Sequence, residues 1–262
     1  MQSKYNSPKD YETCVLELTL TKPRYNDTVP ENFIKKLEQN HANTNDVEAD
    51  GLYRRNPLII ALGDSVTAGA FEGNVGLPEE MIQKYFHGES IEHVIDIENV
   101  YHEKFRCKLA QKYACTAVSM INSGIGGDNV VGMNRRLQRD VLRYDPDLVI
   151  INAVLNGPID IVEYEKNYRM IISKIKENTN ADIIVMTPNN VIPDFEWNLA
   201  ERVDLVKVIA IENHLSIADT YAVWESFTSH GIALEQMLSN NINHPTALGH
   251  EIYALELMKL FI

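Results

Sequence analysis

The pattern of apolar and polar residues predicts alternating strands and helices from residue 58 onward. Residues 58–62 (LIIAL) form an unbroken apolar run between Pro57 and Gly63, which is typical of a parallel strand covered on both faces. Similar runs predict four more strands, at residues 117–121, 148–153, 183–186 and 215–218. Helical spacing predicts helices over residues 100–113, 130–144, 159–177, 197–213 and 246–261. This alternation implies right-handed βαβ units and a five-stranded parallel sheet with helices on both faces.

Residues 1–56 are predicted to be an N-terminal extension rather than an independent domain, and residues 57–262 the main domain. Residues 15–20 (VLELTL) alternate well enough to predict a half-exposed strand. Residues 30–39 predict a short helix, and residues 40–50 are polar and loop-like. The extension is interpreted either as cover for the main sheet or as a contact for a partner or a second copy.

Polar clusters follow the predicted strands, at the edge where open α/β sheets bind ligands. Ser65 follows the first strand and begins a predicted helix with free N–H groups, a suitable place for a nucleophile. Serine and aspartate are also ordinary helix caps, so this segment alone leaves both readings open. The other clusters are residues 122–128 (NSGIGGD), 155–157 (LNG) and 240–245 (NNINHP). Together they offer a hydroxyl, an imidazole and N–H donors, which acyl transfer from a serine requires.

Composition and charge argue against some classes of binding partner. The 262 residues are 45% hydrophobic and carry a formal net charge of −13, which argues against nucleic acid or an anionic membrane as a partner. No apolar run is long enough to predict a transmembrane helix, and the first 30 residues lack the apolar core of a signal peptide. The 3 cysteines lack metal-ligand spacing. We therefore expect a reduced, cytoplasmic protein without a structural disulfide or a metal; its oligomeric state is not predicted.

Taken in order, the four clusters resemble the motifs of the SGNH, or GDSL-type, serine hydrolases. The matching residues are GDSV at 63–66, SGIGGD at 123–128, Asn156 and His244. The resemblance covers residues 58–262 and implies a flavodoxin-like three-layer α/β/α sandwich with strand order 2-1-3-4-5. It also implies hydrolysis of an ester of a lipid or an acylated sugar, or of a thioester, without a metal or organic cofactor.

The resemblance assigns a role to each matching residue. Ser65 is the expected nucleophile, and its own N–H is an expected donor to the oxyanion of the tetrahedral intermediate. The N–H of Gly124 and the side-chain amide of Asn156 are the further expected donors. His244 is the expected general base.

Two departures from the family pattern bear on activity. The third motif is commonly Gly-x-Asn-Asp, whereas residues 154–157 read VLNG, with more bulk and without the carboxylate. The family also places an Asp a few residues before the His, where this chain has Asn240 and Asn241. A neutral amide stabilises an imidazolium less well than a carboxylate does. We predict that Asn241, or alternatively Asn240, occupies the position that orients the ring. The remaining alternative is that a backbone carbonyl orients it, which gives a Ser–His dyad.

Two functions therefore remain open. One is a serine esterase, of reduced activity, that acts on a small acyl or carbohydrate-linked ester. The other is a catalytically weakened relative that binds an acylated ligand or a protein partner. Residues 69–97 and 157–164 are the predicted walls of the substrate pocket. A dinucleotide-binding loop at residues 124–129 is disfavoured, because Asn129 stands where the final glycine of G-x-G-x-x-G belongs.

Overall fold

A five-stranded parallel sheet forms the centre of the computed structural model, which describes residues 8–42, 56–71, 94–114, 117–157 and 159–261. The strands are β1 (Leu58–Gly63), β4 (Ser119–Gly124), β5 (Leu148–Asn152), β6 (Asp182–Met186) and β7 (Ser216–Ala218). Their order is β4-β1-β5-β6-β7. When only these strands are numbered along the chain, the order reads 2-1-3-4-5. The labels differ because β2 (Ala70–Phe71) and β3 (Val94–Ile95) form a separate antiparallel pair.

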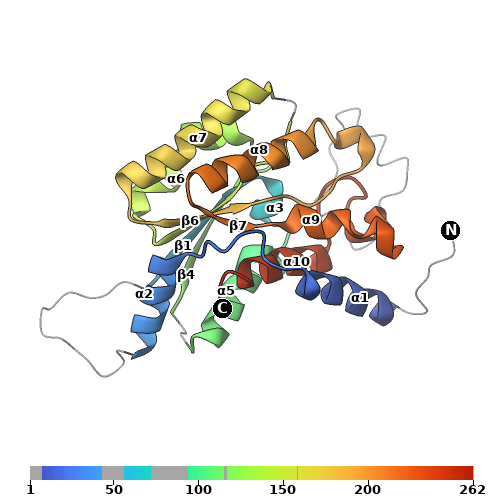
Figure 1. The fold of residues 1–262 in the computed structure, drawn as a ribbon, viewed down its shortest axis with the longest axis horizontal. Coiled ribbons are helices and arrows are strands. Elements are labelled where there is room, and N and C mark those ends of the chain that lie inside the picture. The colour runs from blue at the N-terminus through green and yellow to red at the C-terminus, as the bar shows by residue number, and fades with distance from the viewer. Residues whose placement is uncertain (1–7, 43–55, 72–93, 115–116, 158, 262) are drawn as a thin grey trace, which may run out of the picture.

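Helices cover both faces of the sheet (Figure 1). One layer holds α6 (Val130–Asp140), α7 (Ile161–Asn178) and α8 (Leu199–Glu212), and the other holds α5 (Tyr101–Lys112) and α10 (Ala247–Met258). The central strands β1 and β5 are buried almost throughout, as their apolar runs predict. The predicted three-layer α/β fold is confirmed.

The connections between strands place the candidate catalytic residues at the carboxyl ends of the strands. From β1 the chain moves outward to β4, and it then returns across β1 to β5 before continuing to β6 and β7. The carboxyl ends of β1 and β5 therefore flank the point where the direction of winding changes. Open α/β sheets bind their ligands at such a switch point. Ser65 follows β1 here, and Asn156 follows β5.

The prediction of a strand at residues 15–20 is wrong, because these residues lie within helix α1 (Pro8–Thr21). Tyr11, Cys14, Val15 and Leu18 recur at helical spacing and pack on a core cluster that includes residues of α9 (Thr220–Glu225) and α10. This stripe was masked by the short alternation of residues 15–20. The predicted helix at residues 30–39 is α2 (Glu31–Ala42). Its Phe33 is 1% exposed and packs edge-on against Phe261, with ring centroids 6.1 Å apart.

Element boundaries also differ where polar residues continue a regular structure. Strand β4 runs on to Gly124, because the pairing with β1 continues through Leu62–Ser123 and Gly63–Gly124. The predicted helix at 130–144 ends at Asp140 and is followed by a 3-10 turn. The sequence did not predict α9 or the short helical turns. The 3-10 turns are Leu142–Tyr144, Pro193–Phe195, Thr228–His230 and Leu234–Met237.

Candidate active site

Ser65 lies on a tight turn between β1 and the short helix α3 (Ser65–Ala68). The Asp64 side chain caps this helix by accepting a hydrogen bond of 3.0 Å from the Val66 N–H. Glycine is required at position 63, since a Cβ there would lie 2.0 Å from Thr67 Oγ1. The turn thus presents Ser65, which is 6% exposed, at the carboxyl end of the buried strand.

Helix α5 is hydrogen-bonded to α3 and supports it. The hydroxyl groups of Thr67 and Tyr101 share a hydrogen bond of 3.0 Å, and His102 Nε2 lies 3.0 Å from the Thr67 carbonyl oxygen. His250, from α10, accepts the N–H of Tyr101 at the start of α5. Burial lowers the pKa of His102 to about 4 and that of His250 well below its usual range. Both rings are therefore neutral structural supports, consistent with the absence of a matching motif around either.

His244 lies in a loop that is closed by its own backbone. Ser239 N–H donates to the His244 carbonyl at 2.7 Å, and Thr246 N–H donates to the Met237 carbonyl at 2.8 Å. The side chain of Asn240 fills this loop. Its Oδ1 accepts the N–H groups of Ile242, Asn243 and His244 at 2.9, 2.9 and 3.0 Å, and its Nδ2 donates to Asn243 Oδ1.

The loop brings His244 to Ser65. Its Nε2 lies 2.8 Å from Ser65 Oγ, and both side chains are 6% exposed. Asn241 stands three residues before His244 in the left-handed conformation, with φ of 55°. Because Asn240 is committed to the loop's own N–H groups, Asn241 is the better candidate of the two for orienting the ring.

The end of β4 packs directly on α3. A Cβ on Gly124 would lie 2.1 Å from Ala68 N, so only glycine permits this approach. The Gly124 N–H donates to Asn122 Oδ1 at 2.9 Å and would have to leave this acceptor to bind an oxyanion. Gly127, in the same loop, has φ of 71°, and its N–H makes no hydrogen bond to the described residues.

The side chain of Asn156, which follows the end of β5, contacts the loop that follows β4. Its Nδ2 donates to the Asp128 carbonyl at 2.8 Å, which leaves the other amide hydrogen for a ligand. The backbone before it is held by Arg202, whose Nε and Nη2 donate to the carbonyls of Val154 and Leu155 at 3.0 and 3.3 Å. A Cβ on Gly157 would lie 2.8 Å from the Arg202 guanidinium. In this chain a buried arginine fixes the loop where the family motif has a carboxylate.

Asp64 is a buried carboxyl beside the Ser–His pair. Burial raises its pKa to about 6, while the Val66 N–H and the charge of His244 act in the opposite direction. Its Oδ2 makes no hydrogen bond within the described part of the chain. The carboxyl interacts electrostatically with the imidazole of His244.

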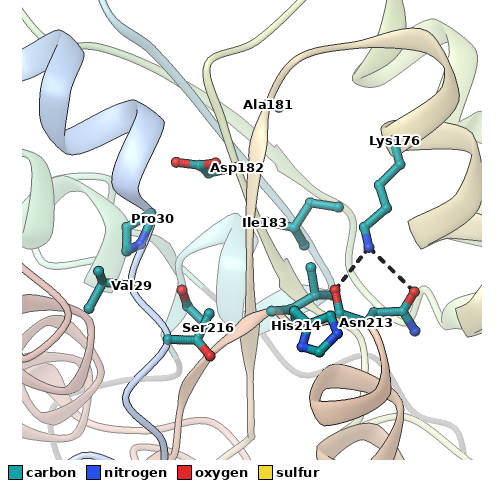
Figure 2. Close-up of a pocket in the computed structure, with 11 residues that line it drawn as sticks. Val29, Pro30, Lys176, Ala181, Asp182, Ile183, Asn213, His214 and Ser216 are labelled. Carbon is teal, nitrogen blue, oxygen red and sulfur yellow. Dashed lines mark hydrogen bonds between the residues drawn. The ribbon is translucent and has the colours of Figure 1, made fainter.

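A separate hollow lies at the other end of the sheet, beside the amino ends of β6 and β7 (Figure 2). It measures about 190 Å³ and is lined by Asp182 and Ile183 at the start of β6 and Ser216 at the start of β7. Lys176 donates here to the carbonyl and side-chain oxygens of Asn213. Because it faces the amino ends of the strands, this hollow is remote from Ser65. In the described residues no three His, Cys, Asp or Glu side chains gather as metal ligands.

The model of the GDSL-like lipase/acylhydrolase family matches residues 61–252. The chain belongs to this family. The match begins within β1 and ends within α10, so it spans the Ser65 turn and the His244 loop. No curated protein sequence matches the chain.

Solved structures of the family share the fold at low identity. An acetylxylan esterase from Geobacillus stearothermophilus is 22% identical, with a TM-score of 0.60 over 79% of this chain and 94% of that one. A putative GDSL-like lipase from Parabacteroides merdae is 19% identical, with a TM-score of 0.62 over 80% and 97%. A lipase/acylhydrolase from Enterococcus faecalis is 20% identical, with a TM-score of 0.56 over 78% and 95%.

The structure brings most of the residues predicted for the site to one place. Ser65 and His244 are in contact, Gly124 abuts α3, and Asn156 bonds the loop that follows β4. The sequence did not single out Arg136, Arg202 or the loop role of Asn240. Most of the predicted pocket wall, residues 72–93 and 158, lies outside the described residues. No helix in the described part of the chain is both long and apolar enough to cross a membrane.

Proposed function

We propose that the protein is a serine esterase that hydrolyses a small acyl or carbohydrate-linked ester through an acyl-enzyme on Ser65. The hydrogen bond of 2.8 Å between Ser65 Oγ and His244 Nε2 carries this proposal. A general base must lie within hydrogen-bond reach of the proton that it removes, and this ring does. Membership of an acylhydrolase family supports ester hydrolysis as the reaction class.

In this mechanism His244 Nε2 takes the proton of the Ser65 hydroxyl as Oγ attacks the ester carbonyl. The imidazolium then gives the proton to the departing alcohol, which leaves an acyl group on Ser65. Water attacks this acyl-enzyme with His244 again as base, and the carboxylic acid product leaves.

Three donors are proposed for the oxyanion that forms in each attack. Ser65 is the first residue of α3, where a backbone N–H has no acceptor inside the helix. The second Asn156 amide hydrogen is another donor. The third is a backbone N–H of the loop after β4, either Gly124 once it leaves Asn122 or Gly127.

The positive charge of the imidazolium needs a partner. Asn241 is proposed to orient the ring as a neutral acceptor. The buried Asp64 carboxylate is proposed to supply negative charge, since it interacts electrostatically with His244. These two groups would together replace part of what the usual aspartate provides.

The proposal is tested with a fluorophosphonate probe, which reacts with an activated serine. We expect the native protein to be labelled at Ser65 and to hydrolyse p-nitrophenyl acetate. Ser65→Ala should lose both properties, whereas Ser173→Ala, at an exposed serine on α7, should keep them. Because one structural neighbour is an acetylxylan esterase, acetylated xylo-oligosaccharides are the first natural-type substrates to assay. Hydrolysis that persists unchanged in Ser65→Ala would refute the proposal.

A second test concerns the ring orienter. Asn241→Asp should raise kcat for p-nitrophenyl acetate about tenfold, because a carboxylate stabilises the imidazolium. Asn240→Asp should not raise it, because that side chain serves the loop N–H groups and would lose its bond to Asn243. Equal gains from both changes, or none from either, would contradict the assignment of Asn241.

The rival function, a binding protein with a weakened site, is less well supported. Such a protein has no need to keep a buried serine and histidine in hydrogen-bond contact. The loop around Asn156 retains its support through Arg202, despite the missing carboxylate. Absence of labelling in a folded protein would favour the binding function.

A further inference from the structure

One buried guanidinium group lies behind the loops that carry the proposed oxyanion donors. Arg136, on α6, is 9% exposed. Its Nε donates to Asp128 Oδ2 at 2.6 Å and its Nη2 to the Gly63 carbonyl at 2.9 Å. Its Nη1 donates to the Ser123 carbonyl at 2.9 Å and to Asp140 Oδ2 at 3.0 Å. A single side chain therefore joins the ends of β1 and β4 to the loop at Asp128.

Two of these acceptors are carbonyls of peptide units next to the site. The Ser123 carbonyl belongs to the same planar peptide as the Gly124 N–H, so a bond to the oxygen fixes the direction of that N–H. The Gly63 carbonyl belongs to the peptide that precedes Asp64, at the turn into α3. The Ser123 hydroxyl accepts a further bond of 3.0 Å from Nη1. These contacts set the backbone direction at both loops.

The third contact reaches Asn156 through Asp128. Arg136 binds the Asp128 carboxylate, and the carbonyl of the same residue accepts the Asn156 amide. Room for this carboxylate is provided by Gly132, where a Cβ would lie 1.8 Å from Asp128 Oδ1. Residues 128, 132, 136 and 140 are spaced by four, so they form one ridge along the start and body of α6.

We propose that Arg136 is a positioning residue of the esterase site. It touches no substrate, but it fixes the position of the Gly124 peptide and, through Asp128, that of the Asn156 amide, which both carry proposed oxyanion donors. This inference rests on the proposed esterase function. An arginine suits the role because its planar fork donates to several acceptors in fixed directions, which a lysine does not do.

The test is Arg136→Lys, which keeps the positive charge and removes the planar guanidinium group with its several donors. We expect kcat for p-nitrophenyl acetate to fall about 10- to 100-fold, with KM changed less than about threefold, because the donors act on the transition state. The rate of fluorophosphonate labelling of Ser65 should fall by a similar factor, because that reaction also builds charge on an oxygen held by these donors. A kcat and a labelling rate equal to those of the native protein would overturn the inference.

Arg135→Lys is the matched control, because it makes the same substitution on the neighbouring residue of α6, where the side chain is exposed. It should leave kcat and the labelling rate within about twofold of the native values. If it lowers kcat as much as Arg136→Lys does, the loss is not specific to the buried guanidinium and the inference fails.

Should Arg136→Lys not fold, Asp128→Asn asks the same question. It keeps the side-chain shape, weakens the bond to Arg136 and should lower kcat about tenfold; an unchanged kcat would overturn the inference. A native protein without Ser65-dependent hydrolysis would instead refute the proposed function, so the two failures are distinguishable.

Discussion

His244→Ala is expected to lower kcat for p-nitrophenyl acetate by about 10³-fold or more, because the only base in contact with the Ser65 hydroxyl within the described structure is removed. KM should change little, since the imidazole accepts the proton of the Ser65 hydroxyl in the transition state and does not bind the ester in the ground state. Steady-state kinetics with the native protein and the variant in parallel measure both constants.

The variant should remain folded, because main-chain atoms of His244 take part in closing the loop and are kept in alanine. Asn240 Oδ1 and the Ser239–His244 backbone bond use main-chain atoms that alanine retains. Thermal unfolding followed by circular dichroism checks this. His214→Asn is the matched control, since His214 is exposed, distant from the site and in a left-handed conformation that asparagine tolerates. Retention of more than about a tenth of the native kcat in His244→Ala would exclude it as the base.

The main fold was predictable because its strands are long apolar runs that only a doubly covered sheet buries. Residues 58–62 and 148–153 are of this kind, and they became the central strands β1 and β5. Residues 15–20 misled the prediction because their alternation is short. The stripe from Tyr11 to Leu18 has helical spacing, and its burial depends on a surface formed by α9 and α10 far along the chain. Tertiary packing decided that element.

The parts of the site that belong to sequence motifs were predictable, and their supports were not. Ser65 and His244 stand in recognisable segments, although the contact between them spans most of the chain. Arg136 lies 73 residues from Gly63 in sequence, and Arg202 lies 48 from Val154. Nothing local marks either arginine as a partner of a loop carbonyl. The four-residue spacing of Asp128, Gly132 and Arg136 was the one local signal, and its meaning depends on knowing that the Asp128 side chain, which lies just before α6, bonds Arg136.

Gly124→Ala is expected to lower the free energy of unfolding by about 2–4 kcal/mol, because the added methyl group has no room. The new Cβ would lie 2.1 Å from Ala68 N and 2.5 Å from the Thr67 carbonyl carbon, which are backbone atoms that no rotamer change moves. Helix α3 is hydrogen-bonded to α5 through Thr67. The added methyl group therefore forces β4 and α3 apart against these bonds, and this movement displaces Ser65, the first residue of α3. A displacement of about 1 Å is enough to lower kcat roughly 100-fold. Urea unfolding and steady-state kinetics measure the two effects.

Gly126→Ala is the matched control for stability. It adds the same methyl group two residues further along the chain, where no atom of the described residues, apart from the two chain neighbours, lies within 4 Å and φ is not positive. Its free energy of unfolding should stay within about 0.5 kcal/mol of the native value. The difference between the two alanine variants therefore isolates the contact of β4 with α3 from the general effect of replacing a loop glycine. If both variants proved equally stable, β4 and α3 would separate without cost, and their close approach would not explain the glycine at position 124.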